Sequence, residues 1–224
     1  MAGRLRGLWH TAPATLALAS ACVAVFAAQR TMAGTEFLLG RAFLEPFLYL
    51  FGIHPPLLFS EGFFWQPLTY AFLHGSWFHL AVNLLGLMLF GFSLEGEFGT
   101  RRFRALFFTS AMLGGLLWAA GNGLWHLRTG DPCGTCVGAS GGVYGLVGAY
   151  AALYANRKLY VLIAFVPLRL RGKSLAIVIL LLTVLDAALD FTGTAYAAHF
   201  VGFVAGWLLG RRWRNLGFGE ANAF

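Results

Sequence analysis

Charged side chains are scarce in this sequence. Asp, Glu, Lys and Arg make up 11% of its 224 residues, whereas an ordinary water-soluble domain contains about 25%. Hydrophobic residues make up 58%, and the mean hydropathy is +0.70. A water-soluble fold of this length would expose apolar surface that it cannot cover. The composition therefore excludes a disordered chain and an ordinary soluble domain, and it predicts a polytopic membrane protein.

Cysteine and metal-binding motifs are also rare. The chain has three cysteines, which is too few for a disulfide framework to hold the fold. Two of them form the C-x-x-C pair Cys133 and Cys136, which could close as a disulfide or remain a reactive pair. A zinc site built from His74, His79 and His199 is disfavoured because no H-E-x-x-H motif or carboxylate ligand accompanies them. We therefore expect neither a metal nor an organic cofactor.

Long apolar runs are what the sequence does contain. A helix needs about 20 apolar residues to cross roughly 30 Å of hydrocarbon. Six segments qualify, namely 13–29, 77–94, 103–121, 140–155, 174–189 and 196–210. The first also resembles a signal peptide, but we interpret it as a span because the five later spans need a starting side. The sequence thus predicts an all-α bundle of six transmembrane helices in one domain, residues 1–224.

Lys and Arg are distributed very unequally between the two sides of these spans. With a cytoplasmic N-terminus, thirteen of the sixteen lie inside, and Arg30, Arg41 and Arg128 lie outside. The positive-inside rule predicts such a split. Both termini should therefore be cytoplasmic, in a bacterial inner membrane by preference and an organelle membrane as the alternative. The pattern also accounts for the net charge of +7 without nucleic acid as a partner.

Two loops are too apolar to be plain connectors. The outer loop, residues 30–76, is rich in aromatic side chains, and we expect it to fold back along the membrane interface as short amphipathic helices. The inner loop at 160–170 is apolar between two basic clusters. We expect either a membrane-lying segment there or inward extensions of the fourth and fifth helices.

A glycine-rich motif opens the fourth span. It reads Gly138-Ala139-Ser140-Gly141-Gly142-Val143-Tyr144-Gly145. Ser140 would sit at a helix N-terminus, where free N–H groups favour a developing anion. Tyr144 follows one turn later on the same face. The alternative interpretation is a capping serine on a helix that packs through small residues.

Two further motifs place polar side chains inside apolar spans. His199 precedes Gly202 and Gly206, which form a small-residue stripe that admits a neighbouring backbone. His79 and Asn83 share one face of the second span, and both can donate hydrogen bonds to an oxyanion. A packing histidine and a polar interface patch are the respective alternatives.

These three motifs, in this order, resemble those of the rhomboid family of intramembrane serine proteases. The resemblance covers about residues 64–211. It implies that Ser140 is the nucleophile and His199 the general base of a dyad without a buried aspartate. It also implies that His79, Asn83 and the Ser140 amide form the oxyanion hole.

The resemblance assigns supporting roles as well. Tyr144 would pack on the His199 ring, and Gly138 would leave room for the substrate carbonyl. Glu95 and Gly99 match positions that are structural in the family. The pair Trp65-Gln66 departs from the Trp-Arg that members commonly carry in the first outer loop.

The function implied is hydrolysis of single-span transmembrane proteins near the outer face of the membrane, in contact with membrane lipids. The first alternative is a rhomboid-like pseudoprotease that only binds membrane clients, although such proteins usually lack the serine or the histidine. The second is a channel or transporter, for which we would expect charges deep in several spans. The only candidates for such charges are Asp186 and Asp190, near the fifth span.

Overall fold

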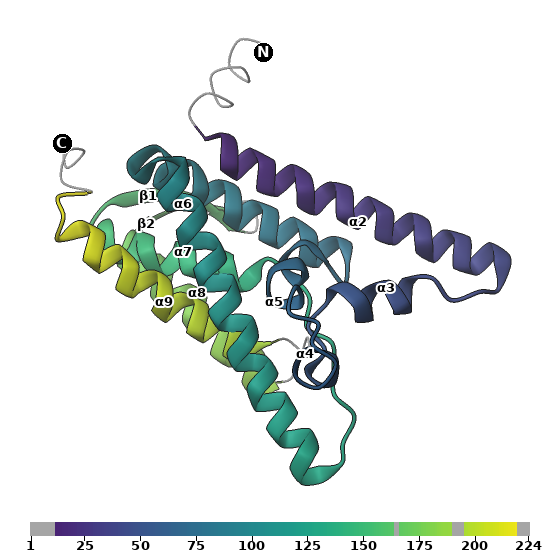
Figure 1. Ribbon diagram of the computed structural model, residues 1–224. Helices are drawn as coiled ribbons and strands as arrows, with labels where there is room; N and C mark the ends of the chain where they lie inside the picture. Colours follow the sequence, from purple (N-terminus) through teal and green to yellow (C-terminus); the bar gives the residue numbers. More distant parts are fainter. Residues whose placement is uncertain (1–11, 164–165, 190–194, 219–224) are drawn as a thin grey trace.

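Helices dominate the architecture of the protein (Figure 1). The computed structural model describes residues 12–163, 166–189 and 195–218. The helices are α2 (Pro13–Leu39), α3 (Leu44–Phe51), α4 (Pro55–Phe59), α5 (Gln66–Thr69), a 3-10 turn (Tyr70–Phe72), α6 (Trp77–Thr129), α7 (Ser140–Leu153), α8 (Gly172–Leu189) and α9 (Tyr196–Arg214). Each predicted span coincides with one of these helices or with part of one.

Helix α6 contains two of the predicted spans. It is 53 residues long and breaks at Gly99, whose φ of 73° lies in the left-handed region that glycine adopts without strain. The first half lies along α2, and the second half runs back against α7 and α9 (Figure 1). Among the described helices, α2 and α6 are long and apolar enough to cross a membrane. The count of six spans stays a prediction.

A buried carboxylate joins α2 to the break in α6. Glu95 is 1% exposed. Its Oε1 accepts hydrogen bonds from the Ala14 amide and the Thr100 hydroxyl, both at 2.8 Å. Its Oε2 accepts from the Thr15 amide at 2.7 Å and the Thr15 hydroxyl at 2.8 Å. The first N–H groups of a helix have no intrahelical partner and carry partial positive charge, so Glu95 serves as the N-terminal cap of α2.

Glycine lets α7 and α9 pack with their backbones in contact. A Cβ atom on Gly202 would overlap the Gly141 carbonyl oxygen, and one on Gly206 would overlap the Gly145 carbonyl oxygen. A Cβ on Gly210 would lie 2.8 Å from the Ala149 Cα. The glycine stripe of the last span therefore faces the glycines of the fourth.

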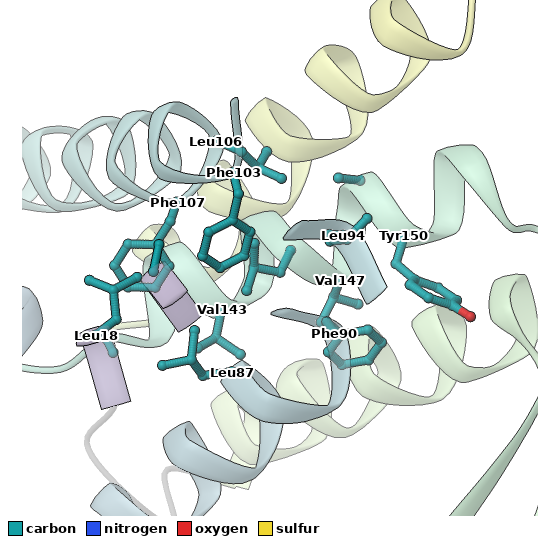
Figure 2. Packing of buried hydrophobic residues seen from close by; sticks show 14 of the residues in the cluster. Leu18, Leu87, Phe90, Leu94, Phe103, Leu106, Phe107, Val143, Val147 and Tyr150 are labelled. Atoms are coloured by element: carbon teal, nitrogen blue, oxygen red, sulfur yellow. The ribbon is translucent and has the colours of Figure 1, made fainter. Parts of the chain in front are cut away.

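The largest hydrophobic cluster lies between α2, α6 and α7. Figure 2 shows Leu18 of α2, Leu87 and Phe107 of α6, and Val143 and Val147 of α7 converging on one region. Phe107 also fills the space beside Gly142, where an added Cβ would lie 2.6 Å from its ring. Val143 and Val147 anchor in this cluster the first two turns of α7, the helix that begins at Ser140.

The inner loop forms a β-hairpin, so the expected extension of the fourth and fifth helices over residues 160–170 is wrong, and a membrane-lying segment stays a prediction. Strand β1 (Lys158–Ile163) pairs antiparallel with β2 (Val166–Arg171), with Lys158 opposite Arg171. An apolar run of this length cannot be assigned to helix or strand by periodicity alone. The segment is rich in β-branched and aromatic residues, which favour strands. Pro167 disfavours a helix and is tolerated in an edge strand.

The predicted outer loop begins too early, because α2 continues through residues 30–39; the rest of it contains the short helices α3, α4 and α5, held by side-chain hydrogen bonds. Gln66 is 0% exposed; its Nε2 donates to the Tyr49 carbonyl at 2.7 Å, and its Oε1 accepts from the His54 amide at 3.1 Å. The Trp65 indole donates to the Leu50 carbonyl at 2.8 Å. The Trp-Gln pair that departs from the family pattern thus fastens this loop. The position of the loop relative to a bilayer stays a prediction.

We expect Glu95→Gln to destabilise the protein, because each carboxylate oxygen accepts a backbone N–H of α2. Whichever oxygen becomes NH₂ then faces a donor. The loss should be about 1.5–3 kcal/mol, measured as a lower thermal unfolding temperature in detergent micelles. The control is Glu61→Gln, which makes the same charge change on an exposed side chain. Equal unfolding temperatures for both variants would contradict the capping role.

Gly206→Ala should destabilise the protein by about 1–3 kcal/mol, because the added methyl group overlaps the α7 backbone. Gly121→Ala is the matched control, since it is also helical but has no atom within 4 Å of an added Cβ. That control should be neutral or slightly stabilising. Thermal unfolding in micelles distinguishes the two, and a Gly206→Ala protein as stable as the control would contradict backbone contact.

Candidate active site

The structure brings Ser140 and His199 into direct contact, although 59 positions separate them in the sequence. Ser140 is the first residue of α7, and His199 lies in the first turn of α9. The Ser140 Oγ and the His199 Nε2 are 2.8 Å apart, which is a hydrogen-bond distance. The contact of Gly202 with Gly141 sets this spacing, because it aligns the N-terminal ends of the two helices. A hydroxyl beside an imidazole is a nucleophile beside a base.

Tyr144 holds the plane of the His199 ring. The two rings stack with centroids 4.3 Å apart and an interplanar angle of 6°. The Tyr144 hydroxyl hydrogen-bonds with the Thr183 hydroxyl of α8, which itself donates to the Ile179 carbonyl at 2.8 Å. Tyr144 therefore donates to Thr183. Helix α8 thus helps to orient the imidazole, because Thr183 holds Tyr144 and Tyr144 stacks on the His199 ring.

Ser140 and His199 lie in a depression of about 540 Å³. The same depression is lined by three of the other predicted site residues, His79, Asn83 and Tyr144. Side chains from α6, from α7, from α9 and from the segment before Ser140 therefore converge on one space. The motifs that are far apart in the sequence form one site.

Gly138 brings the backbone before Ser140 against the His79 ring. Its φ is 128°, and a Cβ at this position would lie 2.7 Å from the His79 Cε1 and Nε2. Its amide donates to the Tyr70 carbonyl at 2.9 Å. Glycine is thus required here both by conformation and by space, and the Nε2 edge of His79 faces the turn that carries Ser140.

Asn83 is buried, and its side-chain Nδ2 donates to the His79 carbonyl at 2.9 Å. One of its two N–H groups is therefore committed to its own helix, which leaves the second for the depression. The Ser140 amide belongs to the first turn of α7, where backbone N–H groups have no intrahelical acceptor. His79, Asn83 and Ser140 thus line the same depression, and each carries an N–H group that can donate to an anion.

Two features near the site were not predicted from the sequence, namely Gln29 and the role of the segment around His74. Gln29 of α2 is 1% exposed and His74 is 0% exposed. The Gln29 Oε1 accepts from the His74 amide at 3.0 Å, and its Nε2 donates to the His74 carbonyl at 3.2 Å. Burial lowers the pKa of His74 to about 4, so the ring is neutral at pH 7. Gln29 could have been identified from the sequence as a polar amide side chain at the end of the apolar run 13–29.

The C-x-x-C segment forms part of the wall of the site. Both thiols are free in the structure, so of the two alternatives the disulfide is not present. The Cys136 backbone exchanges hydrogen bonds with that of Ile53 at 2.9 and 3.0 Å. Burial raises the pKa of the Cys136 thiol to about 12, so this thiol is protonated at neutral pH. Within the described residues no three His, Cys, Asp or Glu side chains cluster as metal ligands.

Comparison with known proteins gives consistent matches. The family model described as "Rhomboid domain" matches residues 61–215. RHOMBOID-like protein 5 of Arabidopsis thaliana is 33% identical over 156 residues, which cover 68% of this chain and 45% of that protein. Rhomboid-like protease 1 of Toxoplasma gondii is 28% identical over 169 residues, or 71% of this chain and 50% of that protein.

Rhomboid protein 1, mitochondrial, of Saccharomyces cerevisiae is 32% identical over 142 residues, which cover 62% of this chain and 39% of that protein. The chain thus spans half or less of the length of each of these relatives. The matched region includes the segments that carry Ser140 and His199.

Proposed function

This chain belongs to the rhomboid family, a family of multi-pass membrane proteins, and from that premise we propose that it is an intramembrane serine endopeptidase. The observation that carries the proposal is the 2.8 Å contact between the Ser140 Oγ and the His199 Nε2 in the depression. A pseudoprotease that binds membrane clients has no need for a hydroxyl and an imidazole in this geometry. The dyad therefore favours an enzyme.

The reaction follows from the positions of the two groups. The Ser140 Oγ attacks the substrate carbonyl carbon, and the His199 Nε2 takes the hydroxyl proton. The imidazolium then gives that proton to the leaving amine as the peptide bond breaks. Water, activated by the same imidazole, hydrolyses the acyl-enzyme and releases the serine. The stack on Tyr144 keeps the ring in one plane through both proton transfers.

The tetrahedral intermediate carries a negative charge on the former carbonyl oxygen. We assign its stabilisation to the Ser140 amide, the His79 Nε2–H and the free N–H of Asn83. Donors that are fixed before the reaction stabilise the developing charge without reorganisation. Gly138 keeps the approach to these donors free of a side chain. No step of this mechanism requires a metal or an organic cofactor.

The substrate class is inferred from the exposed apolar side chains at the rim of the depression. Phe78 and Val82 line the depression and are 78% and 50% exposed. An apolar, exposed rim suits contact with lipid, and it suits a transmembrane segment that passes from the lipid into the depression. A helical backbone hides its carbonyl groups, so the segment must unwind locally to meet Ser140. We propose single-span membrane proteins as substrates.

The proposed orientation places the dyad near the outer face. Helices α7 and α9 run from Ser140 and His199 toward the hairpin β1–β2 and the C-terminal end of α9 (Figure 1). Those far ends carry exposed cations, among them Lys158, Arg171 and Arg211. Cationic ends favour the cytoplasmic side. We therefore propose six spans with both termini cytoplasmic, in a bacterial inner membrane by preference.

A fluorophosphonate probe tests the nucleophile directly. We expect wild type to become covalently labelled and to cleave a reconstituted model substrate, whereas Ser140→Ala should do neither and His199→Ala should lose turnover below detection. Ser60→Ala, which changes an exposed serine of the outer loop, is the control and should behave as wild type. Wild-type protein that binds a membrane client but neither labels nor cleaves would identify a pseudoprotease.

The oxyanion assignment predicts an ordering of turnover in liposomes at saturating substrate. His79→Ala and Asn83→Ala should each lower kcat by about 10- to 1,000-fold, and the double variant should be lower still, with KM little changed. Asn122→Ala is the matched control, because Asn122 also donates to the carbonyl four residues back in α6, at 3.1 Å. If Asn83→Ala and the control have the same turnover, Asn83 has only a structural role.

A further inference from the structure

We propose that Gln29 of α2 is a positioning residue for the proposed hydrolysis, and that it acts by fixing the ring orientation and tautomer of His79. The inference rests on the proposed function, because Gln29 can affect hydrolysis only if Ser140 and His199 carry it out. Gln29 lies outside the matched region, residues 61–215. Among the described residues, its hydrogen bonds go to the His74 backbone and not to a group that reacts.

Gln29 holds the peptide group on each side of His74. Its amide oxygen accepts the His74 N–H at 3.0 Å, and its amide nitrogen donates to the His74 carbonyl at 3.2 Å. Both residues are 1% exposed or less, so water does not compete for these hydrogen bonds. The two bonds together fix the direction of the chain where it enters α6.

The segment that Gln29 holds makes the next contacts, with His79. The Gly75 amide, which follows directly on the His74 carbonyl, donates to the His79 Nδ1 at 3.4 Å. The Ser76 hydroxyl accepts from the His79 amide at 3.1 Å and caps α6. The His74 ring packs edge-on against the His79 ring, with centroids 5.2 Å apart. Backbone, ring plane and Nδ1 of His79 are thus all set by residues 74–76.

The contact from Gly75 decides which nitrogen of His79 carries the proton. A neutral imidazole has one donor and one acceptor nitrogen, so an Nδ1 that accepts leaves the proton on Nε2. Nε2 is the atom that faces Gly138 and the turn of Ser140. The other tautomer would present a lone pair to the oxyanion and repel it. Gln29 therefore supports the donor that the transition state needs, which affects turnover and not substrate binding.

Gln29→Met tests this role, because it keeps the approximate shape of the side chain and removes both hydrogen bonds. We expect kcat to fall by about ten-fold, within the range for a lost oxyanion donor, with KM changed less than about two-fold. Thr15→Val is the matched control. Thr15 is also a buried residue of α2 whose side chain hydrogen-bonds to α6, at Glu95. It should lower thermal stability and leave the kcat of the folded protein unchanged.

A double variant shows whether Gln29 acts through His79. In a His79→Ala background, Gln29→Met should lower kcat no further. A further loss of about ten-fold in that background would overturn the inference. So would a Gln29→Met single variant with wild-type kcat, and so would a Thr15→Val variant that loses as much turnover as Gln29→Met.

Gln29→Glu keeps the test decisive if the methionine variant does not fold. A protonated glutamic acid has one acceptor and one donor, as the amide has, whereas the carboxylate has no donor for the His74 carbonyl. Its kcat relative to wild type should therefore rise as the pH is lowered. A ratio that stays about ten-fold low at every pH would overturn the inference. Wild-type protein that neither labels nor cleaves would instead overturn the proposed function and this inference with it.

Discussion

The contact between the glycine faces of α7 and α9 is the interaction on which the site depends. Gly202 and Gly206 lie so close to the carbonyl groups of Gly141 and Gly145 that no side chain fits between them. Two helices with larger residues at these positions would pack 8–10 Å apart, with side chains between their backbones. The 2.8 Å contact between the Ser140 Oγ and the His199 Nε2 requires the closer packing. The dyad is thus a consequence of backbone contact at one end of two helices.

A second constraint places α6 opposite the dyad. The break at Gly99, where φ is positive, divides α6 into two halves. The N-terminal end of the first half carries His79 and Asn83, which line the same depression as Ser140. Helix α2 is tied to this half by Glu95 near the break, and to the segment just before α6 by Gln29, which bonds to His74. Both contacts are buried hydrogen bonds that are strong in a low dielectric and costly to leave unmade. A helix outside the family motifs therefore supports the entrance to the second span.

Among the described residues, a tyrosine and a threonine orient the imidazole. Tyr144 stacks on the His199 ring, and Thr183 of α8 holds the tyrosine hydroxyl. An aromatic face restrains the plane of the ring, and it does so without burying an additional charge, which would be expensive in a lipid environment. Within the described residues, these orienting contacts are ring packing and neutral hydrogen bonds. The same choice is seen at Gln29, which fixes the His74 segment with an amide.

The sequence alone determined the helices and the residues that share a helix face, because span length and the i, i+4 spacing are local properties. It therefore predicted the pairs His79 with Asn83 and Ser140 with Tyr144, and the glycine stripe behind His199. Its helical alternative for residues 160–170 was wrong, because a continuous apolar run suits a strand as well as a helix. Tertiary structure alone decided that Gln29 meets His74 and that Thr183 meets Tyr144. Such contacts depend on the relative rotation and depth of two helices, which packing over the whole interface sets and no local spacing encodes.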